Sequence, residues 1–187
     1  MPVLRRLALI GLALTVLSGC AGYRPQSAEF NNLLLEPYRL DSGDNLRVTV
    51  FDQPNLTNTY AVDTSGYISM PLIGMIEARG HTTDELEDLI EAALRQGFLR
   101  SPDVSAEVQT YRPFFVMGEV RNAGQFPYVP GTTVQTAIAI AGGFTARAVR
   151  STVDVTRSIN GEVISGRVEM TEPIRPGDTI YIRERWF

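Results

Sequence analysis

Residue types that could carry out catalysis or hold a metal ion are scarce in this sequence. The chain has a single cysteine, Cys20, and a single histidine, His81. A histidine-based metal site would need acidic residues as its remaining ligands, and His81 lies next to a predicted helix start, where we expect a structural role. The phosphate loop, the dinucleotide-binding glycine motif and the Gly-x-Ser-x-Gly nucleophile turn are absent from the sequence. We therefore predict that the chain is not an enzyme and has no catalytic residue, metal ligand or cofactor.

Acidic residues cluster in the segment 84–91, where a pair of catalytic carboxylates would first be sought. The segment is predicted to be helical, and adjacent residues of a helix do not face each other. Neighbouring acids in it therefore cannot form a general acid–base dyad by themselves, and we interpret them as a solvated helix face. A pair from distant segments, such as Asp52 with Asp63, stays open at this point.

The first nineteen residues have the features of a secretion signal. Arg5 and Arg6 precede an apolar run of about eleven residues, whereas spanning a hydrocarbon core takes roughly 20. A permanent transmembrane helix is therefore the weaker alternative, and we predict a signal peptide over residues 1–19.

The end of this segment, Leu17-Ser18-Gly19-Cys20, resembles the lipobox of bacterial lipoproteins. The resemblance implies cleavage between Gly19 and Cys20, and lipidation of Cys20. A conventional cleavage site with an incidental cysteine is the alternative. Because Ala21 follows instead of aspartate, the resemblance also implies the periplasmic face of the outer membrane.

The charge balance argues against nucleic acid as a partner. The chain carries 17 basic residues, all of them arginine, against 21 acidic residues, which gives a formal net charge of −4. Scattered arginines on an acidic chain provide no basic patch of the kind that binds polyanions. A ring of arginines assembled in an oligomer would escape this argument.

Residues 20–37 show no sustained hydrophobic period, and we predict a tether there.

Alternating apolar residues after this tether predict strands. The strand that contains Leu46 would follow a turn at Gly43-Asp44, where glycine can take a positive φ. Two later strands would form a hairpin around Gly66. The expected strand ranges are 46–51, 60–62, 67–70 and 104–108.

The clearest helix begins after His81. Thr82 and Glu85 fit a capping box, and Gly97 is placed to end the helix. Apolar residues spaced at i, i+3, i+4, i+7 and i+8 form one buried face. They are Leu86, Leu89, Ile90, Ala93 and Leu94.

Pro113 marks a predicted joint, and a second domain is expected to follow it. A short helix over 133–141 would end at Gly142-Gly143. Asn160-Gly161 is the strongest hairpin signal in the chain. The expected strands of this part are 114–120, 124–129, 153–155, 163–168 and 179–182.

The segment 172–182 repeats the form of 38–48: an apolar residue, two residues, Gly-Asp, one residue, and then alternating apolar positions. The first copy contains Gly43-Asp44 and the second Gly177-Asp178. One turn-to-strand arrangement used twice and a true duplication both explain the pattern.

From Tyr38 to the C-terminus the residues together resemble the bacterial outer-membrane polysaccharide export family. One half is similar to its export domain and the other to its soluble-ligand-binding β-grasp (SLBB) domain. The matching motifs are Tyr38-x-Leu40-x-x-Gly43-Asp44-x-Leu46, Val62-x-x-x-Gly66-x-Ile68-x-x-Pro71-x-x-Gly74, Val116-x-Gly118-Glu119-Val120 and Ala137-Ile138-x-x-Ala141-Gly142-Gly143.

The resemblance implies an α+β chain of two small mixed domains, an export domain over 38–112 and an SLBB-like domain over 113–187. It further implies a homo-oligomeric periplasmic ring that conducts capsular or exopolysaccharide and docks on an inner-membrane copolymerase. Long members carry a second β-grasp domain and a C-terminal membrane helix. Because this sequence stops after a predicted strand, we expect a short member that relies on a separate outer-membrane β-barrel. A monomeric glycan-binding lipoprotein is the alternative.

No residue takes a chemical role under this hypothesis. Glu119 and Arg121, at a strand end, are candidate contacts between subunits, with a solvated pair as the alternative. The remaining candidate positions are expected to shape turns. They are Gly43, Asp44, Gly66, Gly118, Gly142, Gly143, Gly177 and Asp178.

Overall fold

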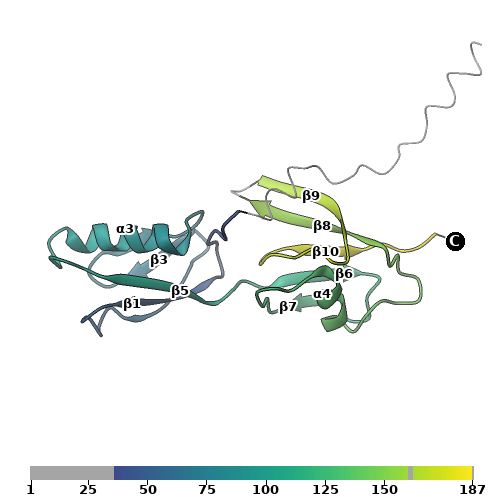
Figure 1. Cartoon of the computed structure of the whole chain (residues 1–187), viewed down its shortest axis with the longest axis horizontal. Helices are drawn as coiled ribbons and strands as arrows, with labels where there is room; N and C mark the ends of the chain where they lie inside the picture. Colours follow the sequence, from purple (N-terminus) through teal and green to yellow (C-terminus); the bar gives the residue numbers. More distant parts are fainter. Residues whose placement is uncertain (1–35, 160–161, 187) are drawn as a thin grey trace, which may run out of the picture.

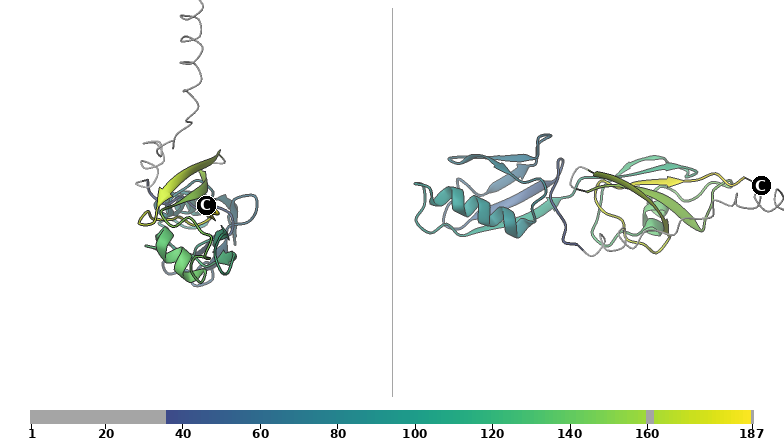
Figure 2. Two further views of the ribbon diagram at one scale, coloured as in Figure 1. Left: turned by 90° about the vertical axis from the view of Figure 1, so that its right-hand side faces the viewer. Right: turned by 90° about the horizontal axis from the view of Figure 1, so that it is seen from above.

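The computed structural model describes residues 36–159 and 162–186, which form two units placed end to end (Figures 1 and 2). One hydrophobic core is built from residues between Leu40 and Val108, and a second from residues between Phe114 and Ile182. The chain is α+β, as predicted. The predicted signal peptide and lipidation site, Gly19 and Cys20 included, lie outside the described residues.

A three-stranded antiparallel sheet, in the order β2-β1-β5, supports the N-terminal unit. Along β1 the side chains of Leu46, Val48 and Val50 are buried and their neighbours are more exposed, which confirms the predicted alternation. The strands are β1 (Asn45–Val50), β2 (Asn58–Ala61) and β5 (Val104–Thr110).

The predicted hairpin between residues 60–62 and 67–70 is wrong. Strand β2 pairs with β1, while β3 (Tyr67–Met70) pairs with β4 (Gly74–Glu77). Asp63 redirects the chain between β2 and β3, because its carboxylate accepts the backbone N–H groups of Ser65 and Tyr67, at 2.8 and 2.9 Å. These backbone hydrogen bonds lower the pKa of Asp63 below its usual value.

Helix α3 (Thr83–Arg95) has the predicted capping box, in which the Thr82 and Glu85 side chains bond to each other's backbone N–H groups. Leu86, Ile90 and Leu94 of its apolar face are completely buried. Leu89 is 38% exposed and lies at the margin of that face.

The acidic residues of α3 are not simply a solvated face. Glu87 Oε1 accepts the Ala106 backbone N–H at 2.6 Å, and Glu91 Oε1 accepts that of Val104 at 3.2 Å. Both N–H groups belong to β5, one of the two edge strands of the sheet. Two carboxylates of the helix therefore cover donors that an edge strand leaves unpaired, and the solvated interpretation was wrong for these two residues.

A five-stranded sheet, in the order β7-β6-β10-β8-β9, supports the C-terminal unit. Strand β10 runs parallel to β6, and the other neighbours are antiparallel. Helix α4 packs against the sheet through Val134, Ala137 and Ile138. The elements are β6 (Phe114–Gly118), β7 (Gly124–Phe126), α4 (Val134–Ile140), β8 (Thr152–Ile159), β9 (Glu162–Glu169) and β10 (Thr179–Ile182).

The hairpin of β8 and β9 is confirmed, since Ile159 pairs with Glu162 across a two-residue connection, 160–161, that itself lies outside the described residues. At the end of β6, Gly118 has a φ of +88°, and a Cβ there would lie 2.1 Å from the Ile182 carbonyl oxygen. Only glycine fits this contact with β10. None of the described helices is long and apolar enough to cross a membrane.

Candidate functional site

The two Gly-Asp turns have the same local structure. Asp44 Oδ2 accepts the backbone N–H of Asp41 at 2.9 Å, and Asp178 Oδ2 accepts that of Arg175 at 2.8 Å. In both turns the aspartate N–H also donates to the carbonyl of that same residue, at 3.2 Å. The repeated sequence pattern is therefore a repeated structural device, and both aspartates are completely buried.

An arginine pairs with each buried aspartate. Arg157 donates two parallel hydrogen bonds to the Asp178 carboxylate, of 2.7 Å from Nε and 2.5 Å from Nη2. Arg112 approaches Asp44 with Nη1 at 3.3 Å and also donates its backbone N–H at 2.9 Å. The pairs supply the compensation that a buried carboxylate requires.

Arg112-Pro113, the connection between β5 and β6, touches both turns. The backbone N–H of Arg112 bonds to the Asp44 turn, and the carbonyl of Pro113 accepts the N–H of Gly177 at 3.0 Å. A Cβ at Gly43 would lie 3.5 Å from Arg112 Cβ, and a Cβ at Gly177 would lie 2.6 Å from Arg112 Nε. The Arg112 side chain thus lies against both glycines, where the two units meet.

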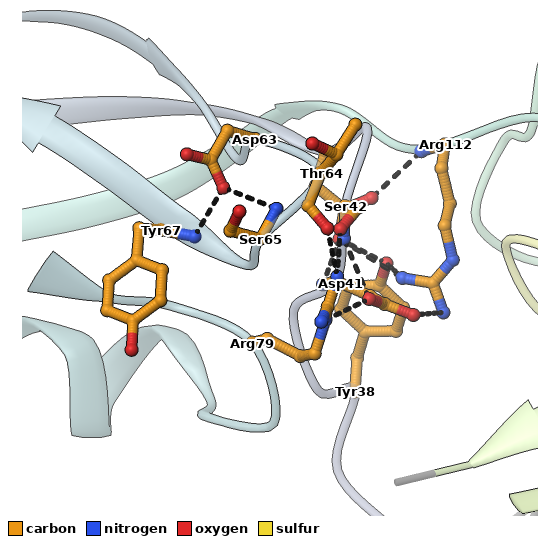
Figure 3. A network of polar contacts seen from close by, with 10 residues as sticks. Tyr38, Asp41, Ser42, Asp63, Thr64, Ser65, Tyr67, Arg79 and Arg112 are labelled. Carbon is orange, nitrogen blue, oxygen red and sulfur yellow. Dashed lines mark hydrogen bonds and ion pairs between the residues drawn. The ribbon is translucent and has the colours of Figure 1, made fainter. Parts of the chain in front are cut away.

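Three tyrosine rings add to the contacts where the two units meet. The rings of Tyr38 and Tyr111 meet edge to face with centroids 5.1 Å apart, and those of Tyr111 and Tyr128 do so at 5.5 Å. The Tyr38 hydroxyl donates to Asp44 at 2.6 Å and accepts from Arg112 at 2.8 Å (Figure 3). Burial raises the pKa of Tyr38, and it raises that of Tyr128 as well.

A cavity of about 280 Å³ opens beside the turns, and both units line it. Its most prominent feature is cationic, because five of its lining residues are arginines. The lining comprises Glu36, Pro37, Tyr38, Arg39, Leu40, Asp41, Arg79, Gly80, Arg112, Arg157, Ser158, Arg175 and Pro176.

Two of these arginines are about half exposed at the N-terminal unit. Arg79 Nε bonds to Asp41 at 2.9 Å, and its Nη2 bonds to the Thr64 carbonyl and to the Ser42 hydroxyl (Figure 3). Arg39 donates to the Gly80 carbonyl at 2.6 Å. Arg39 also pairs with Glu85 at 3.2 Å, so a carbonyl oxygen and a carboxylate hold each guanidinium group in place.

The structure brings only part of the predicted turn residues to this site. Gly43, Asp44, Gly177 and Asp178 meet there, and Gly66 lies under Arg79. Gly118, Gly142 and Gly143 have positive φ angles but belong to other parts of the C-terminal unit.

The candidate subunit contacts lie outside this site. The Glu119 carboxylate accepts a hydrogen bond from the Thr145 hydroxyl of the same chain, and Arg121 is exposed. Their role between subunits stays a prediction. His81 is half-buried, and the described residues contain no cluster suited to a metal ion.

Sequence reasoning missed the arginines of the site and Tyr38. A Gly-Asp turn followed by a buried strand was a usable signal, because an aspartate at such a turn needs a cation once it is buried. Nothing in the sequence indicates which arginine supplies it, since Arg112 and Arg157 come from elements distant along the chain from Asp44 and Asp178.

Comparison with known proteins matches both units. Residues 35–109 match the family described as polysaccharide biosynthesis/export protein, and residues 113–168 match the SLBB domain. The chain is 30% identical over 195 residues to the EPS I polysaccharide export outer membrane protein EpsA of Ralstonia solanacearum. It is 34% identical over 120 residues to the exopolysaccharide production protein ExoF of Rhizobium meliloti.

These alignments cover different shares of each protein. The match to EpsA covers 88% of this chain and 51% of EpsA, and the match to ExoF covers 58% of this chain and 28% of ExoF. The chain thus spans about half the length, or less, of the curated relatives it matches.

Replacing Asp178 with alanine should destabilise the protein by about 3–5 kcal/mol, because the Arg157 guanidinium would stay buried without its carboxylate. Asp154→Ala is the matched control. Asp154 likewise forms ion pairs, in its case with two arginines, but its side chain is 34% exposed. Its replacement should therefore lower the free energy of unfolding by only about 0–1 kcal/mol. Urea denaturation measures both free energies of unfolding. If Asp178→Ala lowers the free energy of unfolding by no more than Asp154→Ala does, the role given to the buried ion pair is contradicted.

Proposed function

Because the chain belongs to the polysaccharide export family, with an export domain and one SLBB domain, we propose that it helps to carry polysaccharide across a bacterial cell envelope. The observation that supports this proposal most directly is that the two family matches fall, in order, on the two packed units. Proteins of this family are transport components, so the chain is not an enzyme. We propose boundaries at 38–112 and 113–187 for the two domains.

We propose that copies of the chain assemble into a ring-shaped conduit for capsular or exopolysaccharide. An apolar face on the five-stranded sheet supports assembly. Phe115 and Met117 of β6 and Tyr181 of β10 are 39–46% exposed, and Tyr181 pairs with Met117 in the register of the two strands. In-register side chains of neighbouring strands share a face, and clustered exposed apolar residues mark contact surfaces.

We place the protein at the periplasmic face of the outer membrane, held by a lipid on Cys20. The Ralstonia solanacearum relative is named an outer membrane export protein, which supports the outer membrane as the location. A set of acyl chains holds a protein persistently, whereas a single chain binds a bilayer only marginally. The expected inner-membrane copolymerase and outer-membrane barrel remain the partners in this proposal.

Substituting serine for Cys20 should release the protein from membranes and reduce polysaccharide export, because the hydroxyl cannot form the thioether to the lipid. Cell fractionation and assay of surface polysaccharide measure the two effects. Ala21→Ser, one residue further on, is the control and should keep both membrane binding and export. Full membrane retention of the Cys20→Ser protein would contradict the anchor.

Solution mass separates the ring from its alternative, a monomeric glycan-binding lipoprotein. The full chain in detergent should give a mass several times that of one chain, and Met117→Glu should lower it by placing charge in the apolar contact. Met75→Glu makes the same change on the 61% exposed side chain of β4, and it should leave the mass unaltered. A stable monomer at high protein concentration would favour the alternative and contradict the ring.

A further inference from the structure

The cavity at the junction is lined by more basic than acidic residues, although the chain as a whole is acidic. The chain has a formal net charge of −4, yet five arginines face one cavity together with only two acidic residues, Glu36 and Asp41. Asp44 and Asp178 lie behind the lining and neutralise Arg112 and Arg157. Arg39 pairs with Glu85 at 3.2 Å and Arg79 pairs with Asp41 at 2.9 Å, which leaves Arg175 as the lining arginine with no ion pair among the described residues.

Arg175 differs from the other four arginines that line the cavity, each of which pairs with a carboxylate. Its Nη2 donates to the Glu36 backbone carbonyl at 2.7 Å, and no carboxylate of the described residues forms an ion pair with it. Burial lowers the pKa of Arg175, and the neighbouring Arg157 guanidinium lowers it further, while the Asp178 and Glu36 carboxylates oppose this shift in part. A half-buried guanidinium beside a second one, held by a neutral oxygen, is a position where an anion would relieve repulsion.

The size of the cavity limits what can enter. Ligand pockets commonly measure about 300–1,000 Å³, so a cavity of about 280 Å³ accepts a single small unit and not a long segment. Both its walls come from fixed turns, because the Gly-Asp hydrogen bonds hold Asp41 on one side and Arg175 on the other. A preformed site of this kind loses little free energy in ordering its side chains on binding.

We propose that this junction cavity binds an acidic sugar of the transported polymer, through the carboxylate of a uronic acid or of a comparable acidic substituent. The inference rests on the proposed export function and adds the substrate class. A guanidinium fork matches the two oxygens of a carboxylate, and Arg175 offers that fork inside the cavity. Arg39 and Arg79 line the rim of the same cavity, although each also pairs with a carboxylate of the N-terminal unit, Glu85 and Asp41 respectively.

The experiment titrates the full chain in detergent with a short oligogalacturonide and, separately, with a neutral oligoglucoside of the same length. Isothermal calorimetry should show saturable binding of the acidic oligosaccharide only, weakened at least tenfold between low and high salt. Arg175→Gln should weaken that binding by tenfold or more, and Arg175→Lys should restore part of it.

Arg100→Gln is the matched control, since it removes the same charge from an exposed turn that does not line the cavity. It should leave binding within twofold of the unaltered protein. Thermal unfolding checks that each variant is folded. If Arg175→Gln fails to fold, Arg39→Gln, which changes an exposed rim residue, carries the test with an expected loss of threefold or more.

Equal binding of the neutral oligosaccharide would overturn the proposal, as would an unchanged affinity in folded Arg175→Gln or, if that variant does not fold, in Arg39→Gln. Inorganic phosphate binding as tightly as the oligogalacturonide would also overturn it, by showing a general anion site. Each outcome is separable from failure of the export function, which would appear as normal export in cells that lack the protein.

Discussion

Two carboxylates with no exposure to water, Asp44 and Asp178, impose the main constraint on this fold. A buried carboxylate must be paired and hydrogen-bonded, or it stays protonated or outside the core. Each aspartate meets this requirement with the backbone of its own turn and with one arginine. Because Arg112 and its neighbour Pro113 touch both turns, pairing the charges also fixes where the second sheet begins relative to the first.

A buried ion pair often adds little net stability, because desolvation offsets the attraction between the charges. In this protein the buried ion pairs matter because they fix the positions of the elements that they connect. The fork of Arg157 on Asp178 ties β8 to the turn before β10, and Arg112 ties the connection to the turn before β1. The same geometry leaves Arg39, Arg79 and Arg175 around one cavity, so the structural pairs and the proposed ligand site depend on the same two turns.

The sequence predicted those features that local rules control. The capping box at Thr82, the alternation in β1 and the hairpin of β8 and β9 each depend on residues close together in the chain. It failed where the outcome depended on distant partners. The alternation of residues 67–70 predicted a strand but could not distinguish β2 from β4 as its partner, and the acids of α3 bond to β5 across nineteen and thirteen residues.

The candidate site shows the same division. The repeat of Gly43-Asp44 as Gly177-Asp178 was visible in the sequence, and the two turns proved to share the same hydrogen bonds. The convergence of the arginines was not visible, because scattered arginines on an acidic chain predict a solvated surface. Only folding brings residues as far apart as Arg39 and Arg175 to one cavity.

Differential scanning calorimetry of the full chain and of Arg112→Ala tests most directly whether the junction joins the two units. If the Gly-Asp turns and the Arg112 side chain couple them, the unaltered protein unfolds in one transition and the variant in two, because the contacts of that side chain with both turns are lost. Two separate transitions in the unaltered protein, or a single transition at an unchanged midpoint in Arg112→Ala, would contradict this account.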